Sequence, residues 1–154
     1  MNLINLNAFE ILKLFNSNKL STVEYVSELM SHIKLREPNV EAWAFLNDDL
    51  VKSYAKKIDK KRSNNLQKSF AGIPIGIKDI IDTKDFPTEN GSKTCLGRKP
   101  KEDAHLVKLL RENDIIIFGK CVTTEFALSA QGKQKTQMTL NVHLVVLHLD
   151  QLPL

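Results

Sequence analysis

The sequence contains few cysteines, and those it has are not arranged to bind a metal. Cys95 and Cys121 are far apart and form no closely spaced pair of the kind that holds structural zinc. The four histidines do not stand at ligand spacing from either cysteine. We therefore expect no metal site, and we expect both cysteines to be buried free thiols in a reducing compartment.

The sequence also has no long apolar stretch. Its longest apolar runs, Ile115–Phe118 and Leu144–Leu147, are far too short to cross a bilayer. The first residues, Met1–Asn7, lack the basic region and apolar core of a signal peptide. These absences predict a cytoplasmic protein with no membrane partner.

Charge of one sign is only slightly in excess, with 22 basic and 18 acidic residues giving a net charge of +4. The densest basic cluster, residues 56–62, is interrupted by Asp59 and has no aromatic residues between its lysines. A nucleic-acid surface would combine such a cluster with a broader basic stripe. The pattern favours a solvated helix end, so we expect no nucleic-acid partner.

The first half of the chain has the periodicity of helices. Ser21–Glu24 reads as a capping box that opens a helix, and Pro38 is expected to close it. Ala42–Leu46 is a candidate strand or a tight connection. Asp48 or Asp49 could cap the helix that follows.

The second half alternates between helix and strand. Ile73–Asp82 is short, apolar and punctuated by glycine, as expected for a buried strand and turn. Asp103 can cap a helix, and Ile115–Phe118 is predicted to be a central strand that Gly119 ends. A helix followed by a strand, twice over, predicts an α/β layered fold.

Lys78 is the main candidate functional residue, because it interrupts an apolar run where burying an ammonium group is costly. Lys78 could extend to solvent or pair with Asp79 or Asp82. The residues alone favour this structural role over a catalytic one. Alternatively, burial could lower its pKa and make it a neutral general base. Gly76 would allow its backbone to approach other segments closely.

A phosphate-binding loop is the rival interpretation of this segment. Gly72, Gly76 and Lys78 resemble a Walker A motif only superficially, because their spacing differs from that motif. Asp79 stands where a serine or threonine would bind magnesium, and its carboxylate would repel phosphate. We reject this interpretation.

Several short motifs occur in a fixed order and together resemble the amidase-signature family of hydrolases over residues 1–133. The motifs are Gly72–Asp79, Asp103-Ala104, Leu109, Gly119-Lys120 and Glu125–Ala127. The resemblance implies an N-terminal fragment of an α/β/α layered fold with a mixed sheet. It also implies a Ser–cis-Ser–Lys triad in which Lys78 is the catalytic base, a small-molecule amide substrate, and no metal or organic cofactor.

Three kinds of function remain open. The sequence of Val122–Phe126 is more similar to that of general amidases than to that of the A-type subunits of glutamyl-tRNA amidotransferases. The amidotransferase subunits are therefore the second candidate. A non-catalytic binding or assembly module that retains the first third of the fold is the alternative from another class. The amide substrate and the oligomeric state are not encoded in any motif we recognise.

The family pattern stops after Lys133, before either triad serine. Read out of frame, the codons of Val142–Leu154 permit Thr-Pro-Gly-Gly-Ser-Ser-Ser-Gly-Ser-Ala-Ala-Ala-Val, which resembles the family's glycine- and serine-rich motif. Our hypothesis is a one-base deletion just after the Lys133 codon, from a pseudogene or a sequencing error. Residues 134–154 would then be an out-of-frame tail without native structure.

A truncated domain of this kind should be inactive, because the lysine alone cannot form an acyl-enzyme. The strands expected to cover Ile73–Ile81 and Ile115–Phe118 would also be missing. We therefore expect unpaired strand edges, an apolar face open to water, and a poorly soluble or partly unfolded chain.

Overall fold

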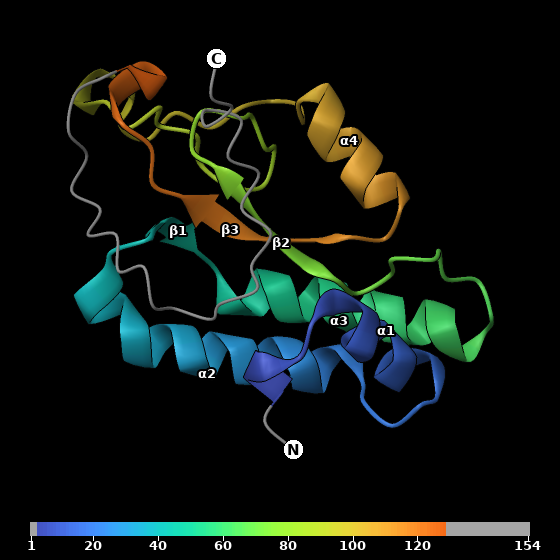
Figure 1. Ribbon diagram of the computed structural model, residues 1–154. Helices are drawn as coiled ribbons and strands as arrows, with labels where there is room; N and C mark the ends of the chain where they lie inside the picture. Colours follow the sequence, from blue (N-terminus) through green and yellow to red (C-terminus); the bar gives the residue numbers. More distant parts are fainter. Residues whose placement is uncertain (1–2, 129–154) are drawn as a thin grey trace, which may run out of the picture.

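The computed structural model describes residues 3–128 and forms a small mixed sheet with helices on both faces (Figure 1). Its helices and strands are α1 (Ala8–Asn16), α2 (Thr22–Val40), β1 (Trp43–Leu46), α3 (Asp48–Ser63), β2 (Pro74–Lys78), α4 (His105–Glu112) and β3 (Ile116–Cys121). The strand order is β1-β3-β2, with β1 antiparallel and β2 parallel to β3. The predicted α/β fold class is confirmed.

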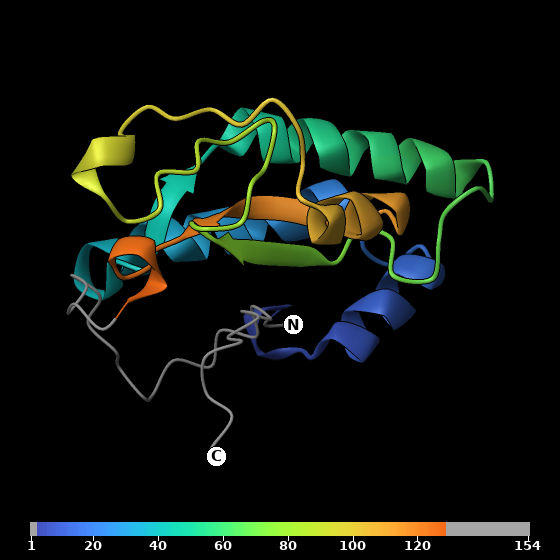
Figure 2. The ribbon, with the colours of Figure 1, turned by 90° about the horizontal axis from the view of Figure 1, so that it is seen from above.

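The helices form a layer on each side of the sheet. Helices α2 and α3 lie below the strands in Figure 1, and α4 lies above them. Seen from above, α3 runs along the direction of β2 and β3, and α1 lies at the opposite end of the layer from β1 (Figure 2). Within residues 3–128, no helix is long and apolar enough to cross a membrane.

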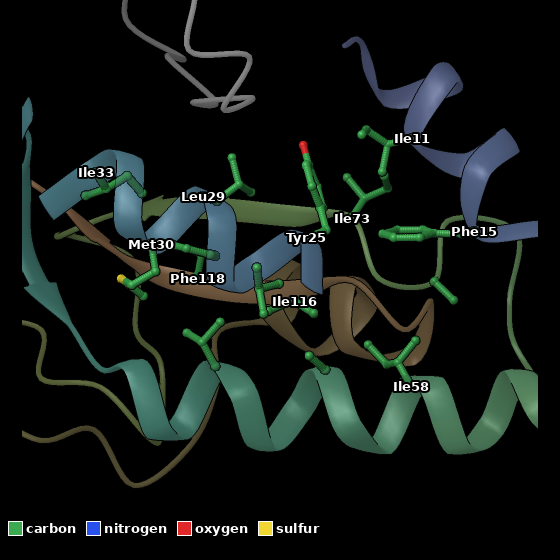
Figure 3. Packing of buried hydrophobic residues seen from close by; sticks show 14 of the residues in the cluster. Ile11, Phe15, Tyr25, Leu29, Met30, Ile33, Ile58, Ile73, Ile116 and Phe118 are labelled. Atoms are coloured by element: carbon green, nitrogen blue, oxygen red, sulfur yellow. The ribbon is translucent and has the colours of Figure 1, made fainter. Parts of the chain in front are cut away.

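Strand β3 is the centre of the core, as its run of β-branched residues predicted. Ile116 and Phe118 point between α2 and α3, where they join Phe15 of α1 in one apolar cluster (Figure 3). Ile117 points the other way, into a second cluster that includes Val107 of α4. This alternation follows from the two-residue period of a strand.

The expectation of an apolar face open to water is wrong for the strands themselves. Ile116, Ile117 and Phe118 are at most 1% exposed, and Ile75 and Ile77 are also buried. Both faces of the sheet are covered by helices and loops that the chain itself supplies. Within residues 3–128, both outer strands are edges of the sheet, because β1 and β2 each pair only with β3.

Helix α2 begins where the sequence predicted but ends later. The Ser21 hydroxyl accepts a hydrogen bond from the Glu24 amide at 3.1 Å, and the Glu24 carboxylate accepts one from the Ser21 amide at 2.8 Å. The prediction that Pro38 closes the helix is wrong, because Pro38 lies inside it. A proline here removes only one helical hydrogen bond near the end. The helix ends at Val40, and the residue after it, Glu41, is the C-cap with a left-handed φ of 52°.

Helix α3 is capped one residue earlier than predicted. The cap is Asn47, whose side chain accepts a hydrogen bond from the Leu50 amide at 3.0 Å. Asp48 and Asp49 instead occupy the first turn, where carboxylates interact favourably with the helix dipole. Asn47, Asp48 and Asp49 all have side chains that can cap a helix, and the cap is Asn47 because its backbone is extended.

Helix α4 has no side-chain cap, so the prediction for Asp103 is wrong. Ala104 occupies the cap position. The Asp103 carboxylate accepts a hydrogen bond from the Lys84 amide at 2.9 Å and one from Arg111 Nε at 3.0 Å. The Asp103 side chain therefore links the loop after β2 to helix α4.

Two glycines lie in the strands because no side chain would fit there. Gly119 does not end β3, which continues to Cys121. A Cβ atom on Gly119 would lie 2.6 Å from the Phe45 carbonyl oxygen, and one on Gly76 would lie 2.6 Å from Cys121 Sγ and 3.1 Å from Trp43. The expected close approach at Gly76 is therefore confirmed.

The basic cluster is a solvated helix end, as predicted, with one exception. Lys56, Lys57, Lys60 and Lys61 are exposed in the last turns of α3. Arg62 is not part of that exposed surface. Its guanidinium donates hydrogen bonds to Thr22 and Asp59 and to the Ala71 carbonyl, which joins α3 to the start of α2.

Candidate active site

Lys78 is the last residue of β2 and is half-buried. It is paired in register with Cys121 at the end of β3, a parallel neighbour. Because side chains alternate along a strand, Lys78 lies on the same face as Gly76. The carboxyl end of parallel strands is where α/β sheets usually place their binding sites.

The two carboxylates that the sequence offered as partners of Lys78 are engaged by other cations. Asp79 forms an ion pair with Lys120, whose ammonium nitrogen lies 3.2 Å from Asp79 Oδ1. Asp82 receives two hydrogen bonds from the Arg98 guanidinium, at 2.6 and 2.8 Å. The pKa of Asp82 is lowered, mainly by the hydrogen bond from Arg98.

Lys120 is the buried lysine of this region, and the sequence places it within a family motif without indicating its role. Its side chain is fully buried in the central strand. Besides the ion pair, its ammonium group donates to the carbonyl oxygens of Ile81 at 2.9 Å and Pro87 at 3.2 Å, and to the Thr88 hydroxyl. The available signal was its position directly after the apolar run of β3.

Asp79 and Lys120 are both affected by burial. Burial raises the pKa of Asp79, and the nearby Lys120 ammonium opposes that rise. Burial likewise lowers the pKa of Lys120, and Asp79 opposes the decrease. Each group therefore depends on the other to remain charged inside the protein.

One surface depression formed by residues 3–128 lies close to Lys78 in sequence but does not include Lys78 in its lining. It has a volume of about 650 Å³, and its lining residues include Ile80, Asp82, Arg98 and Phe126. It is open to solvent and begins two residues after Lys78 along the chain. Its charged groups are already paired, as with Asp82 and Arg98, so we assign no nucleophile or base to it.

The two cysteines differ in exposure, so the expectation that both are buried is only half correct. Cys121 is buried, and burial raises its pKa to about 12. Cys95 is half-buried in the loop after β2. In residues 3–128, no group of three or more histidine, cysteine or acidic side chains could hold a metal ion.

We predict that only one thiol of the native chain will react rapidly with a disulfide reagent such as Ellman's reagent. The thiolate is the reactive form, and Cys121 contributes almost none at neutral pH. Cys95→Ser should abolish the rapid phase, and Cys121→Ser should leave it. Rapid reaction of the Cys95→Ser chain would contradict the burial of Cys121.

Comparison with known proteins gives a consistent family. The family model for amidases matches residues 24–141. Among curated relatives, the A-type subunit of glutamyl-tRNA(Gln) amidotransferase from Bacillus cytotoxicus is 33% identical over 133 residues, covering 86% of this chain and 27% of that protein. A second A-type subunit of this amidotransferase, from Clostridium acetobutylicum, is 37% identical over 112 residues, covering 72% and 23%.

Solved structures agree with the sequence match. An amidase family protein from Bacillus anthracis superposes with a TM-score of 0.73 at 28% identity, over 80% of this chain and 25% of that one. Native peptide amidase from Stenotrophomonas maltophilia gives 0.73 at 24% identity, over 78% and 25%, which supports the shared fold. The chain spans about a quarter of the length of these relatives. It belongs to the amidase family.

Proposed function

We propose that this chain is the N-terminal part of an amide hydrolase in which Lys78 is the catalytic base. The observation that carries the proposal is the placement of Lys78 at the end of a buried strand, beside the end of its parallel neighbour. This position also falls within the residues that match the amidase family. Proteins with α/β sheets commonly place their functional side chains at this edge.

The chemistry proposed for Lys78 follows the family resemblance. Its neutral amine would accept a proton from a cis-serine, which takes one from the nucleophilic serine as that serine attacks the amide carbonyl. Backbone amides would stabilise the oxyanion, and water would then release the acyl group. The substrate class is a small-molecule amide.

Both serines of this scheme are absent from the family-like segment of the chain. We infer that a base was lost just after the Lys133 codon, so that the cis-serine is encoded in another frame. Residues 134–154, which would form the out-of-frame tail, lie outside the described residues. The family match ends at residue 141, so the inferred break lies inside the matched range.

The test compares two purified proteins, the 154-residue chain and the product of a gene with the base restored. Each is incubated with a panel of small aliphatic and aromatic amides, and released ammonia is measured. We expect hydrolysis by the restored product and none by the shorter chain. Hydrolysis by the shorter chain would contradict the proposed triad, and an inactive restored product that folds would argue for a binding or assembly module.

The A-type subunit of a glutamyl-tRNA amidotransferase is the second candidate. It is favoured by the curated relatives, several of which carry that name at 29% to 37% identity. The two candidates differ in what they need. A general amidase should hydrolyse small amides alone, whereas a protein that is one subunit of an amidotransferase is expected to need the other subunits for its activity.

A further inference from the structure

A small hollow lies between helix α3 and the turn that joins α4 to β3. It has a volume of about 190 Å³, and its lining residues include Tyr54, Lys57, Lys61, Arg111, Asp114 and Ile115. This volume is below the roughly 300 Å³ at which pockets for drug-sized ligands begin, so only a small molecule fits. Asp114 and Ile115 precede β3, whereas Lys78 lies beside the other end of that strand. The hollow is therefore separate from the candidate active site.

The Tyr54 ring forms one wall of the hollow and is held from two sides. Its hydroxyl donates a hydrogen bond to the Asp85 carboxylate, and the Arg111 guanidinium lies 5.4 Å from the centre of the ring. Arg111 pairs with both Asp85 and Asp103, and Asp103 is shared with Lys84. Burial and the hydrogen bond to Asp85 raise the pKa of Tyr54 to about 12. Tyr54 thus offers a fixed, uncharged aromatic surface to a ligand.

Lys57 gives the hollow one more cation than it has carboxylates. Lys61 is paired with Asp114, and Arg111 with the two carboxylates described above. Within residues 3–128, Lys57 forms no ion pair. Its ammonium nitrogen lies 5.5 Å from the centre of the Tyr54 ring. A positive charge and an aromatic ring therefore stand side by side at the hollow.

We propose that this hollow binds a small organic anion, a carboxylate on an apolar ring or short chain, with its charge near Lys57 and its apolar part against Tyr54 and Ile115. Ile58 also lines the hollow, so the apolar part would be removed from water. Inorganic phosphate carries the charge but has no apolar part to bury. The ligand would be separate from the amide substrate, because the hollow lies at the other end of β3 from Lys78.

The test measures how far sodium benzoate protects each lysine of the 154-residue chain from trace acetic anhydride, by mass spectrometry of the peptides. We expect saturable protection of Lys57 and Lys61. Lys56 is the unprotected reference, because it is exposed and lies outside the lining. Benzamide, which has the same ring without the charge, should protect about fivefold more weakly, and inorganic phosphate should not protect. Equal protection of all three lysines, or protection by phosphate as strong as by benzoate, would overturn the proposal.

Two neighbouring lysines provide matched variants. Lys57→Met should raise the benzoate concentration that half-protects Lys61 about fivefold, because it removes the unpaired cation. Lys56→Met makes the same change of charge on the same helix and should leave that concentration within about twofold. Both positions are exposed, so both variants should fold, and hydrogen exchange of β3 checks this. Equal effects of the two variants would overturn the proposal, because benzoate would then respond only to the overall charge of α3.

Discussion

Replacing Lys120 with methionine is expected to lower the free energy of unfolding by about 3–5 kcal/mol, the usual cost of breaking a buried ion pair from one side. Methionine fills a similar volume but leaves the buried Asp79 carboxylate without its cation. It also leaves the carbonyls of Ile81 and Pro87 without their donor. Urea unfolding followed by the fluorescence of Trp43 measures the loss.

The loss should depend on pH in a defined direction. Without Lys120, burial raises the pKa of Asp79 further above its unfolded value of roughly 3.9. A carboxyl whose pKa is raised by folding contributes stability that is present below the unfolded pKa and disappears as pH rises through the folded pKa. The gap between variant and original chain should thus be smallest near pH 4 and grow toward neutrality.

Two controls separate the buried charge from a general packing effect. The double variant Lys120→Met with Asp79→Asn removes both charges and should recover part of the loss. Lys108→Met breaks an ion pair with Glu102 that lies at the surface, and it should cause no measurable loss. Equal destabilisation by Lys108→Met and Lys120→Met would contradict this account of the buried pair.

Replacing Lys78 with alanine in the frame-restored product is expected to lower kcat about 100- to 10,000-fold, the range typical of losing a general base. Lys78→Arg should fail as severely, because arginine keeps its proton at all accessible pH values. The substrate affinity should change much less than kcat. Steady-state kinetics with the best amide of the panel measures both.

A matched control is available in the loop after β2. Lys93 is exposed, and Lys93→Ala should leave kcat within about twofold of the original. If Lys78→Arg retained most of the activity, Lys78 would contribute only a positive charge, and its role as the base would have to be abandoned.

Much of the fold could be predicted because its signals are local. The Ser21 capping box needs only a hydroxyl and a carboxylate three residues apart, and both bonds form. The β-branched run at Ile115–Phe118 marks the central strand because burial on both faces favours such residues. The order of helices and strands follows from these periodicities.

The site was less predictable because its contacts join distant residues. Asp79 and Lys120 are far apart in sequence, and the residues next to Asp79 in the chain do not indicate which lysine pairs with its carboxylate. Asp103 illustrates the same limit. Its carboxylate accepts hydrogen bonds from Arg111 and from the Lys84 amide, so it does not cap the helix that follows it. Local rules identify the candidates, and the tertiary fold selects among them.

The most direct test of the proposed origin of this chain is to sequence the gene again across the codons for Gly132 to Gln134 and onward past Leu154. We predict one additional base, an open frame, and the motif Thr-Pro-Gly-Gly-Ser-Ser-Ser-Gly-Ser in place of residues 142–150. That result would support the proposal that the chain is the first part of an amide hydrolase. An unchanged sequence that stops at Leu154 would contradict it, and catalysis would then have to be removed from the description of this chain.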